Sequence, residues 1–238
     1  MKPAPIHGTL NDRASRSFRA LLIVEQYGID FHDQGKRPFD EVCREKGLDP
    51  AAVAAEIESV SRPRVPAELD PALSLRELIQ HINTRHHEYL KLELPRLRAR
   101  LDRMASRHPD RDNALLPRLR EVFVAIQQDL ELHLHKEEDI LFPAIVRLER
   151  AAANGEPPPP TPFGPVRNPI RMMEHEHAAL AQLLIRMRGI ARDYIAPDYA
   201  CANFRAVFNA LKELETDLHE HIHVENDILH VRAAALQA

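Results

Sequence analysis

Residues 129–143 read DLELHLHKEEDILFP, and this stretch governs how the rest of the chain is interpreted. Its His133 and Glu137 are four residues apart, so on a helix they lie one turn apart on the same face. The same spacing returns at His221 and Glu225 in DLHEHIHVENDIL, and both copies fit the pattern H-x-H-x-E-x-D-I-L. The sequence therefore contains an internal repeat that predicts two related helical sites.

Both His/Glu pairs fall on the apolar stripe of their helix. Apolar residues at three- and four-residue spacing lead into each pair and continue to Ile140 and Leu141 in the first copy, and to Ile228 in the second. An unpaired carboxylate in a bundle core costs several kcal/mol. A single such pair is usually a hydrogen-bonded contact in the core, but its duplication favours bound metal.

Composition narrows the functional classes. The net charge of -4 gives no basic surface for nucleic acid. The N-terminal residues lack the apolar segment of a signal peptide, and no apolar run reaches membrane-spanning length. Cys43 and Cys201 lie far apart without metal-binding spacing, which is typical of free thiols in a reducing compartment. We therefore expect a cytoplasmic protein that binds neither nucleic acid nor membranes, and the unusual number in its composition is the count of 14 histidines.

The uneven spread of the 19 prolines suggests how the chain is divided. Residues 1–60 carry short amphipathic segments (13–27, 40–46 and 50–59) and predict a small helical domain, and residues 61–73 form a proline-rich linker. Residues 74–238 contain four long amphipathic segments, at about 74–105, 113–148, 169–194 and 198–236. We therefore expect an all-α protein whose larger domain is an up-down-up-down four-helix bundle.

The first and third long helices should supply the remaining ligands. His177 lies at the centre of the apolar stripe of the third helix. The first helix offers His81, His86 and His87, and its periodicity puts His86 nearer the middle of the stripe and His87 toward the edge. Repeat spacing does not decide between His86 and His87, so both remain candidates.

The resulting set of four imidazoles and two carboxylates, without a thiolate, suits iron, manganese or zinc. Two carboxylates among six ligands can bridge a metal pair and leave each ion open to a small molecule. Two divalent ions would keep a net positive charge beside two glutamates and neutral imidazoles. An oxo or hydroxo bridge, or an anionic ligand, is therefore expected as well.

The order H…HxxxE…H…HxxxE resembles the haemerythrin-like (HHE) domains. Nearly all of residues 10–232 resemble the di-iron proteins that repair iron–sulfur clusters after nitrosative or oxidative stress. The resemblance rests on the segments ELIQHINTRHHEYLKLELPRL, HLHKEEDILFP, MMEHEHAAL and DLHEHIHVENDIL. It implies two non-haem iron ions, bridged by the two glutamates and an oxo or hydroxo group, and it favours His87 over His86. The implied ligands are His87, His133, Glu137, His177, His221 and Glu225, with Glu176 close to the metals.

The resemblance also implies a stress-response function, in which the di-iron centre binds nitric oxide or the protein repairs damaged iron–sulfur proteins. The segment RASRSFRALLIVEQYGIDF resembles the family's small N-terminal domain. However, the family typically has two cysteines followed by Gly-Gly in the next turn, where this chain has Phe31-His32-Asp33-Gln34-Gly35-Lys36. This departure favours an alternative, a haemerythrin-like protein that binds or senses dioxygen or nitric oxide without repair.

Two further expectations follow from the same observations. An oxidase or peroxidase-like di-iron enzyme is a third and weaker interpretation of the ligand set. An N-terminal domain on a short linker is a means of pairing subunits, so a homodimer is a candidate assembly.

Overall fold

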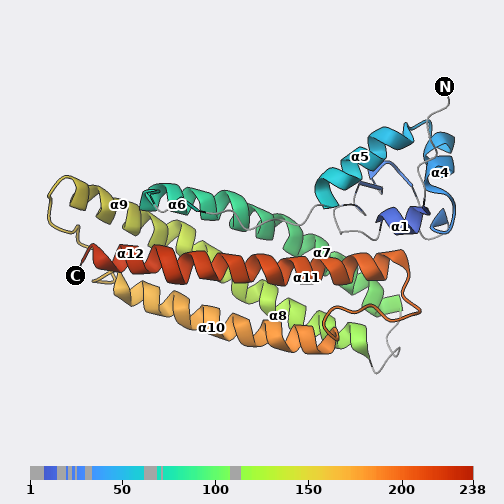
Figure 1. Cartoon of the computed structure of the whole chain (residues 1–238). Coiled ribbons are helices and arrows are strands. Elements are labelled where there is room, and N and C mark those ends of the chain that lie inside the picture. The colour runs from blue at the N-terminus through green and yellow to red at the C-terminus, as the bar shows by residue number, and fades with distance from the viewer. Residues whose placement is uncertain are drawn as a thin grey trace. The chain divides into compact units, whose positions relative to one another are not determined.

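The computed structural model describes residues 8–14, 20, 23–24, 26–29, 34–61, 69–70, 72–107 and 114–237. These residues form helices joined by turns and loops, with an isolated bridge between Thr9 and Pro38 (Figure 1). The predicted all-α class is confirmed. Within this part of the chain, every helix is too short or too polar to cross a lipid bilayer.

The chain divides into two compact units. The first comprises Met1–Val65 together with Ala191–Glu213, and the second comprises Pro66–Ile190 together with Leu214–Ala238. The second unit contains the predicted ligands. The expected domain boundaries at residues 60 and 74 stay predictions.

The first unit includes the short helices α1 (Leu10–Ala14), α4 (Phe39–Glu45) and α5 (Pro50–Ser61). Their buried faces carry Leu10, Phe39 and Ile57. Burial raises the pKa of the Cys43 thiol to about 11, so this cysteine is an inert packing residue. The expected helix at 13–27, the linker at 61–73 and the turn with His32 and Asp33 lie largely or wholly outside the described residues.

Four helical rods, of which the fourth contributes only its part from Leu214 onward to the second unit, confirm the predicted four-helix bundle (Figure 1). In chain order the elements are α6 (Leu75–Ile82), η1 (Asn83–His87) and α7 (Glu88–Arg107), then α8 (Leu115–Lys136), η2 (Glu137–Leu141) and α9 (Phe142–Ala153), then α10 (Arg167–Ile190), then α11 (Ala202–His223), η3 (Val224–Leu229) and α12 (His230–Ala235). Helix α8 packs against both α7 and α10, and α6 packs against α9 and η3. The rod formed by α8, η2 and α9 therefore contacts each of the other three rods.

The elements η1, η2 and η3 are π turns, and each interrupts a rod at the predicted metal layer. A π turn closes hydrogen bonds between residues five apart, so it contains one residue more than an α turn. One extra residue rotates everything beyond it by roughly 100° about the helix axis. Within η2 and η3 the buried face therefore differs from the expected stripe: Ile140 is 46% exposed and Ile228 is half-buried, whereas Leu229 is buried, as is the expected Leu141.

A capping box fixes the start of the first rod. The Ser74 hydroxyl accepts a hydrogen bond from the Glu77 amide, and the Glu77 carboxylate accepts one from the Ser74 amide. The Glu149 carboxylate accepts two further hydrogen bonds, from the amides of Leu75 and Arg76. The first turn of α6 is thereby fully capped.

We expect the Ser74→Ala substitution to lower the free energy of unfolding by about 1 kcal/mol, because one helical amide loses its acceptor. Urea unfolding of the purified protein measures this loss. The matched control is Ser106→Ala, at an exposed serine whose hydroxyl donates to the Arg103 carbonyl and caps no amide. Equal losses in the two variants would contradict the role given to the cap.

Candidate metal centre

The six predicted ligands lie together inside the second unit and are all buried. They come from all four rods: His87 from η1, His133 from α8, Glu137 from η2, His177 from α10, His221 from α11 and Glu225 from η3. The neighbouring helical positions on either side carry buried apolar residues, such as Leu130, Leu218 and Met173. The polar layer is thus enclosed between apolar layers, which keep bulk water away from it.

The six side chains form two groups that share both glutamates. One group is His87, Glu137, His221 and Glu225, and the other is His133, Glu137, His177 and Glu225. Within each group the potential ligand atoms all lie within 4.8 Å of one another. We refer to them as the His87/His221 half and the His133/His177 half of the centre.

The distances explain why each glutamate belongs to both halves. Glu225 Oε1 lies 2.8 Å from His221 Nε2, and its Oε2 lies 3.2 Å from His177 Nε2. Glu137 Oε2 lies 3.5 Å from His87 Nε2, and its Oε1 lies 3.3 Å from His133 Nε2. Each carboxylate therefore directs one oxygen at each half, which is the geometry needed to hold two cations side by side.

The close approach of the buried ligand atoms also fits a pair of cations. The Nε2 atoms of His133 and His177 are 2.9 Å apart, and those of His87 and His221 are 3.1 Å apart. Both Glu137 oxygens are buried without a hydrogen-bond partner among the described residues. Buried acceptors without partners are costly. A cation coordinated by these nitrogens and oxygens in each half would leave none of them without a partner.

The charges within the layer perturb its pKa values in opposite directions. Burial alone lowers the pKa of His133, but the nearby carboxylate of Glu137, 3.3 Å from His133 Nε2, outweighs burial and raises this pKa to about 9. Burial alone raises the pKa of Glu225, but the charge of His221 and hydrogen bonds from His177 and His221 bring it well below its ordinary value. The Glu225 carboxylate is therefore held in the charged form that binds metal, whereas His133 has to lose a proton when a metal ion binds.

A second set of groups orients the imidazoles. His87 Nδ1 lies 2.8 Å from Glu138, which also accepts from Lys91. His133 Nδ1 lies 3.0 Å from Glu176. A carboxylate that accepts from Nδ1–H fixes the tautomer in which Nε2 carries the free lone pair.

The carboxylate of Glu176 also accepts from Lys136, and the Asn226 amide oxygen lies 2.9 Å from His177 Nδ1. Partial burial alone would raise the pKa of Glu176, but the hydrogen bonds from Lys136 and His133 lower it below its usual range. The sequence pointed to Glu176 but missed Glu138 and Asn226. Each of these directly follows a predicted glutamate ligand, and that adjacency is the signal that could have identified them.

The structure places His87, and not His86, within the metal-binding groups. His86 is also buried, but its Nδ1 lies 3.2 Å from Asp217, and its ring stacks on that of His221 with centroids 5.2 Å apart. The extra residue of η1 accounts for the difference from the periodicity, because it rotates His87 into the position one turn beyond Ile82.

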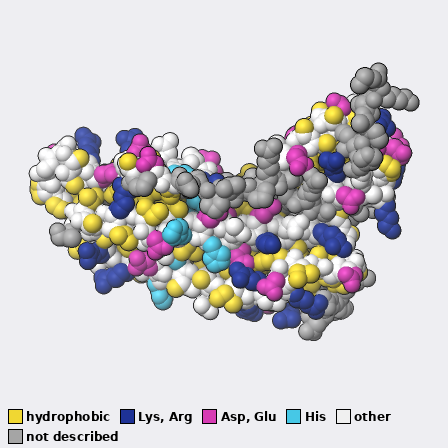
Figure 2. Space-filling view, in the orientation of Figure 1, with side chains coloured by type: hydrophobic (Ala, Val, Ile, Leu, Met, Phe, Trp, Pro, Cys, Tyr) yellow, Lys and Arg dark blue, Asp and Glu magenta, His cyan; other side chains and the backbone are white. Residues whose placement is uncertain are grey.

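The outer histidines of the repeat face solvent. His135 and His223 are exposed, and each pairs with the aspartate four residues later, at 2.7 Å to Asp139 and 2.6 Å to Asp227. Figure 2 shows histidine and acidic side chains close together on the surface of this unit. The repeat therefore encodes an inner His/Glu pair and an outer His/Asp pair.

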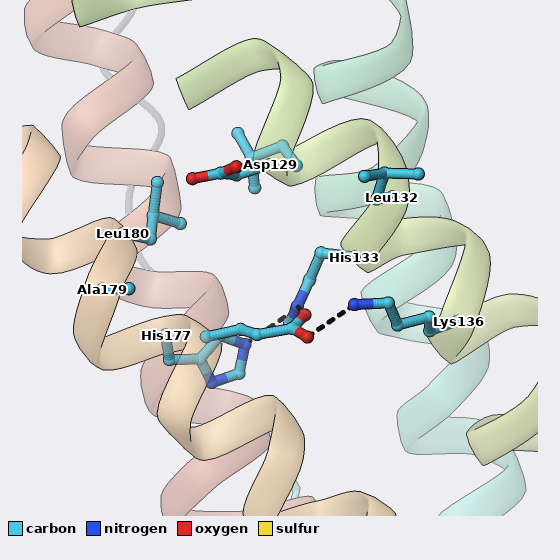
Figure 3. Close-up of a pocket in the computed structure, with 9 residues that line it drawn as sticks. Asp129, Leu132, His133, Lys136, His177, Ala179 and Leu180 are labelled. Carbon is cyan, nitrogen blue, oxygen red and sulfur yellow. Dashed lines mark hydrogen bonds and ion pairs between the residues drawn. The ribbon is translucent and has the colours of Figure 1, made fainter. Parts of the chain in front are cut away.

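A cavity of about 200 Å³ reaches one half of the centre. Figure 3 shows His133 and His177 pointing toward each other from α8 and α10, with Lys136 to the right of them, where it forms an ion pair with Glu176. The lining residues are Asp129, Leu130, Leu132, His133, Lys136, Glu176, His177, Ala179 and Leu180. A small molecule that follows this cavity meets the His133/His177 half first.

The chain matches two known domains. Residues 78–233 match the haemerythrin HHE cation-binding domain, and residues 7–61 match a domain of unknown function, DUF542. The iron–sulfur cluster repair protein YtfE of Salmonella typhimurium is 30% identical over 219 residues, which cover 91% of this chain and 92% of the relative. The YtfE proteins of Salmonella paratyphi B and Salmonella newport match equally well. The chain therefore belongs to the haemerythrin HHE family and, within it, to the family of the iron–sulfur cluster repair proteins.

Proposed function

We propose that this protein is a non-haem di-iron protein of the nitrosative and oxidative stress response, which binds nitric oxide, repairs damaged iron–sulfur proteins, or does both. His87 and His221 hold one iron ion, His133 and His177 hold the other, and both glutamates are shared between them. One observation carries this proposal: Glu137 and Glu225 each direct one oxygen at each group of histidines.

The chain's own residues prepare the site for that chemistry. Glu138 and Glu176 accept from Nδ1 of His87 and His133 and so hold Nε2 as the ligand atom. The apolar layers restrict water, and the cavity beside His133 and His177 admits a molecule of the size of nitric oxide or dioxygen. Two ferrous ions in such a site supply electrons and open positions for a diatomic ligand.

The same centre is suited to two alternative functions. Repair is supported by the match to repair proteins over 91% of the chain. Reversible binding or sensing of nitric oxide or dioxygen, without repair, is supported by the sequence of residues 31–36, which has His32 and Asp33 where the family typically has cysteines. The two functions share the same ligands and differ in whether a damaged iron–sulfur cluster is restored.

A reactivation assay separates the two functions. We expect the iron-loaded protein to restore a nitric-oxide-damaged [4Fe–4S] enzyme several-fold faster than the Glu225→Gln variant, because the variant lacks a ligand that both iron ions share. A variant with His32→Cys and Asp33→Cys tests the missing thiols. Equal reactivation by this variant and the natural chain would make the cysteine pair irrelevant here. No reactivation by either protein, with nitric oxide still bound reversibly, would refute repair and leave binding or sensing.

A further inference from the structure

The two copies of the repeat differ at one buried position. After the shared D-I-L, the first copy continues with Phe142 and the second with His230. Both residues are buried, and they occupy equivalent places in the fold. The Phe142 amide donates to the Glu137 carbonyl across η2, and the His230 amide donates to the Glu225 carbonyl across η3. Each ring therefore follows a shared glutamate by one π turn.

Each of these rings covers one half of the metal centre. The Phe142 ring stacks on that of His87 with centroids 5.6 Å apart and planes inclined by 22°. The His230 ring stacks on that of His177 with centroids 6.2 Å apart and planes inclined by 11°. The His87/His221 half is thus covered by a hydrocarbon ring, whereas the His133/His177 half is covered by an imidazole.

Among the described residues, no hydrogen bond compensates for the burial of the His230 imidazole. The residue is 1% exposed, and neither ring nitrogen has a hydrogen-bond partner among the described residues. An imidazole always carries at least one N–H donor, and leaving such a group unpaired in the interior is destabilising. Phenylalanine, which the first copy uses at the equivalent place, avoids that cost. A residue that breaks a packing rule in this way points to a functional role.

His230 belongs to the half that the cavity reaches because its ring stacks on that of His177, although His230 itself does not line the cavity. The cavity of about 200 Å³ is lined by His133 and His177, the two histidines of that half. His230 belongs to neither group of potential metal ligands, so the geometry does not make it a further ligand. Its free N–H is therefore available to a molecule bound beside the metal.

We propose that His230 donates a hydrogen bond to the small oxygen-containing ligand, such as nitric oxide, that binds at the His133/His177 half of the centre. This inference rests on the proposed di-iron function and assigns the ligand to one half of it. Phe142 offers no donor to the other half. The two halves consequently differ in affinity, although their ligand sets are the same.

The test compares the natural protein with the His230→Phe variant, which copies the first repeat, after both are loaded with iron and exposed to nitric oxide. We expect the two proteins to hold equal amounts of iron. Nitric oxide should leave the variant about tenfold faster, which corresponds to 1.4 kcal/mol. The N–O stretching frequency should shift in D2O only in the natural protein. A purely structural role would not move the isotope shift. In the metal-free variant, the melting temperature should rise by about 3 °C.

Two further variants complete the test. His230→Gln keeps an N–H donor and should restore the D2O shift, and His175→Phe changes an exposed histidine of α10 and should behave like the natural protein. The same D2O shift in His230→Phe as in the natural chain would overturn the inference while leaving the di-iron function intact. Loss of iron from His230→Phe would also overturn it, since His230 would then be a ligand. A natural protein that binds no iron would refute the proposed function itself.

Discussion

The Glu225→Gln substitution should reduce bound iron from about two ions per chain to fewer than one. Glu225 Oε1 lies 2.8 Å from His221 Nε2, and its Oε2 lies 3.2 Å from His177 Nε2. Glutamine keeps the shape of the side chain but carries no charge, and it replaces one oxygen by an NH2 donor. One half then faces a donor instead of a ligand, and both lose the negative charge they share.

Metal analysis after anaerobic loading and desalting measures this loss. The matched control is Glu174→Gln, which makes the same chemical change at an exposed position of α10, outside the metal-binding groups. Far-UV circular dichroism checks that both variants remain helical. If Glu225→Gln retained two tightly bound ions, the carboxylate would not be shared. If it lost only one ion, Glu225 would serve a single half.

The sequence is sufficient to predict the bundle and the members of the polar layer because both depend on spacing. Helical periodicity places His133 and Glu137 on one face, and the second copy repeats that face with His221 and Glu225. Long amphipathic segments with short connections between some of them leave few alternatives to a four-helix bundle. These inferences use only the number of residues per turn, so moderate errors in the helix ends do not affect them.

Periodicity fails where the π turns begin. It assumes 3.6 residues per turn, and η1, η2 and η3 each insert one residue at the metal layer. That insertion explains why periodicity puts His86 nearer the middle of the apolar stripe, although His87 is the residue that lies beside Glu137 and His221. It also explains why Ile140 is exposed. A single sequence contains no local marker for a π turn, because its cost is offset by tertiary contacts at the site.

The orienting groups could not be predicted for a related reason. Glu138 reaches His87 from another rod, 51 residues away in sequence, and Asn226 reaches His177 across 49 residues. Which neighbour a polar residue finds depends on how the rods are rotated against each other. The π turns set that rotation, so the partners become known only with the structure.

Removal of the iron should lower the melting temperature of the bundle by about 10 °C. An ion that binds only the folded chain stabilises it by about 4 kcal/mol when its free concentration is 1,000 times its dissociation constant. For a chain of this size each kcal/mol shifts the melting temperature by roughly 2–4 °C. The effect arises at the layer where Glu137 and Glu225 converge with four imidazoles, because there the ions neutralise buried charge and satisfy unpaired oxygens.

Anaerobic thermal unfolding of the loaded and the chelated protein, followed by circular dichroism, measures this difference. Glu225→Gln serves as the control, because a chain that cannot hold the ions should unfold at the same temperature with and without chelator. Reloading the natural protein should restore the higher temperature, which excludes damage by the chelator. Equal melting temperatures for the loaded and the chelated natural protein would mean that the His/Glu layer is stable as a hydrogen-bonded polar core. The two shared glutamates would then be structural residues, and the proposed di-iron function would lose its physical basis.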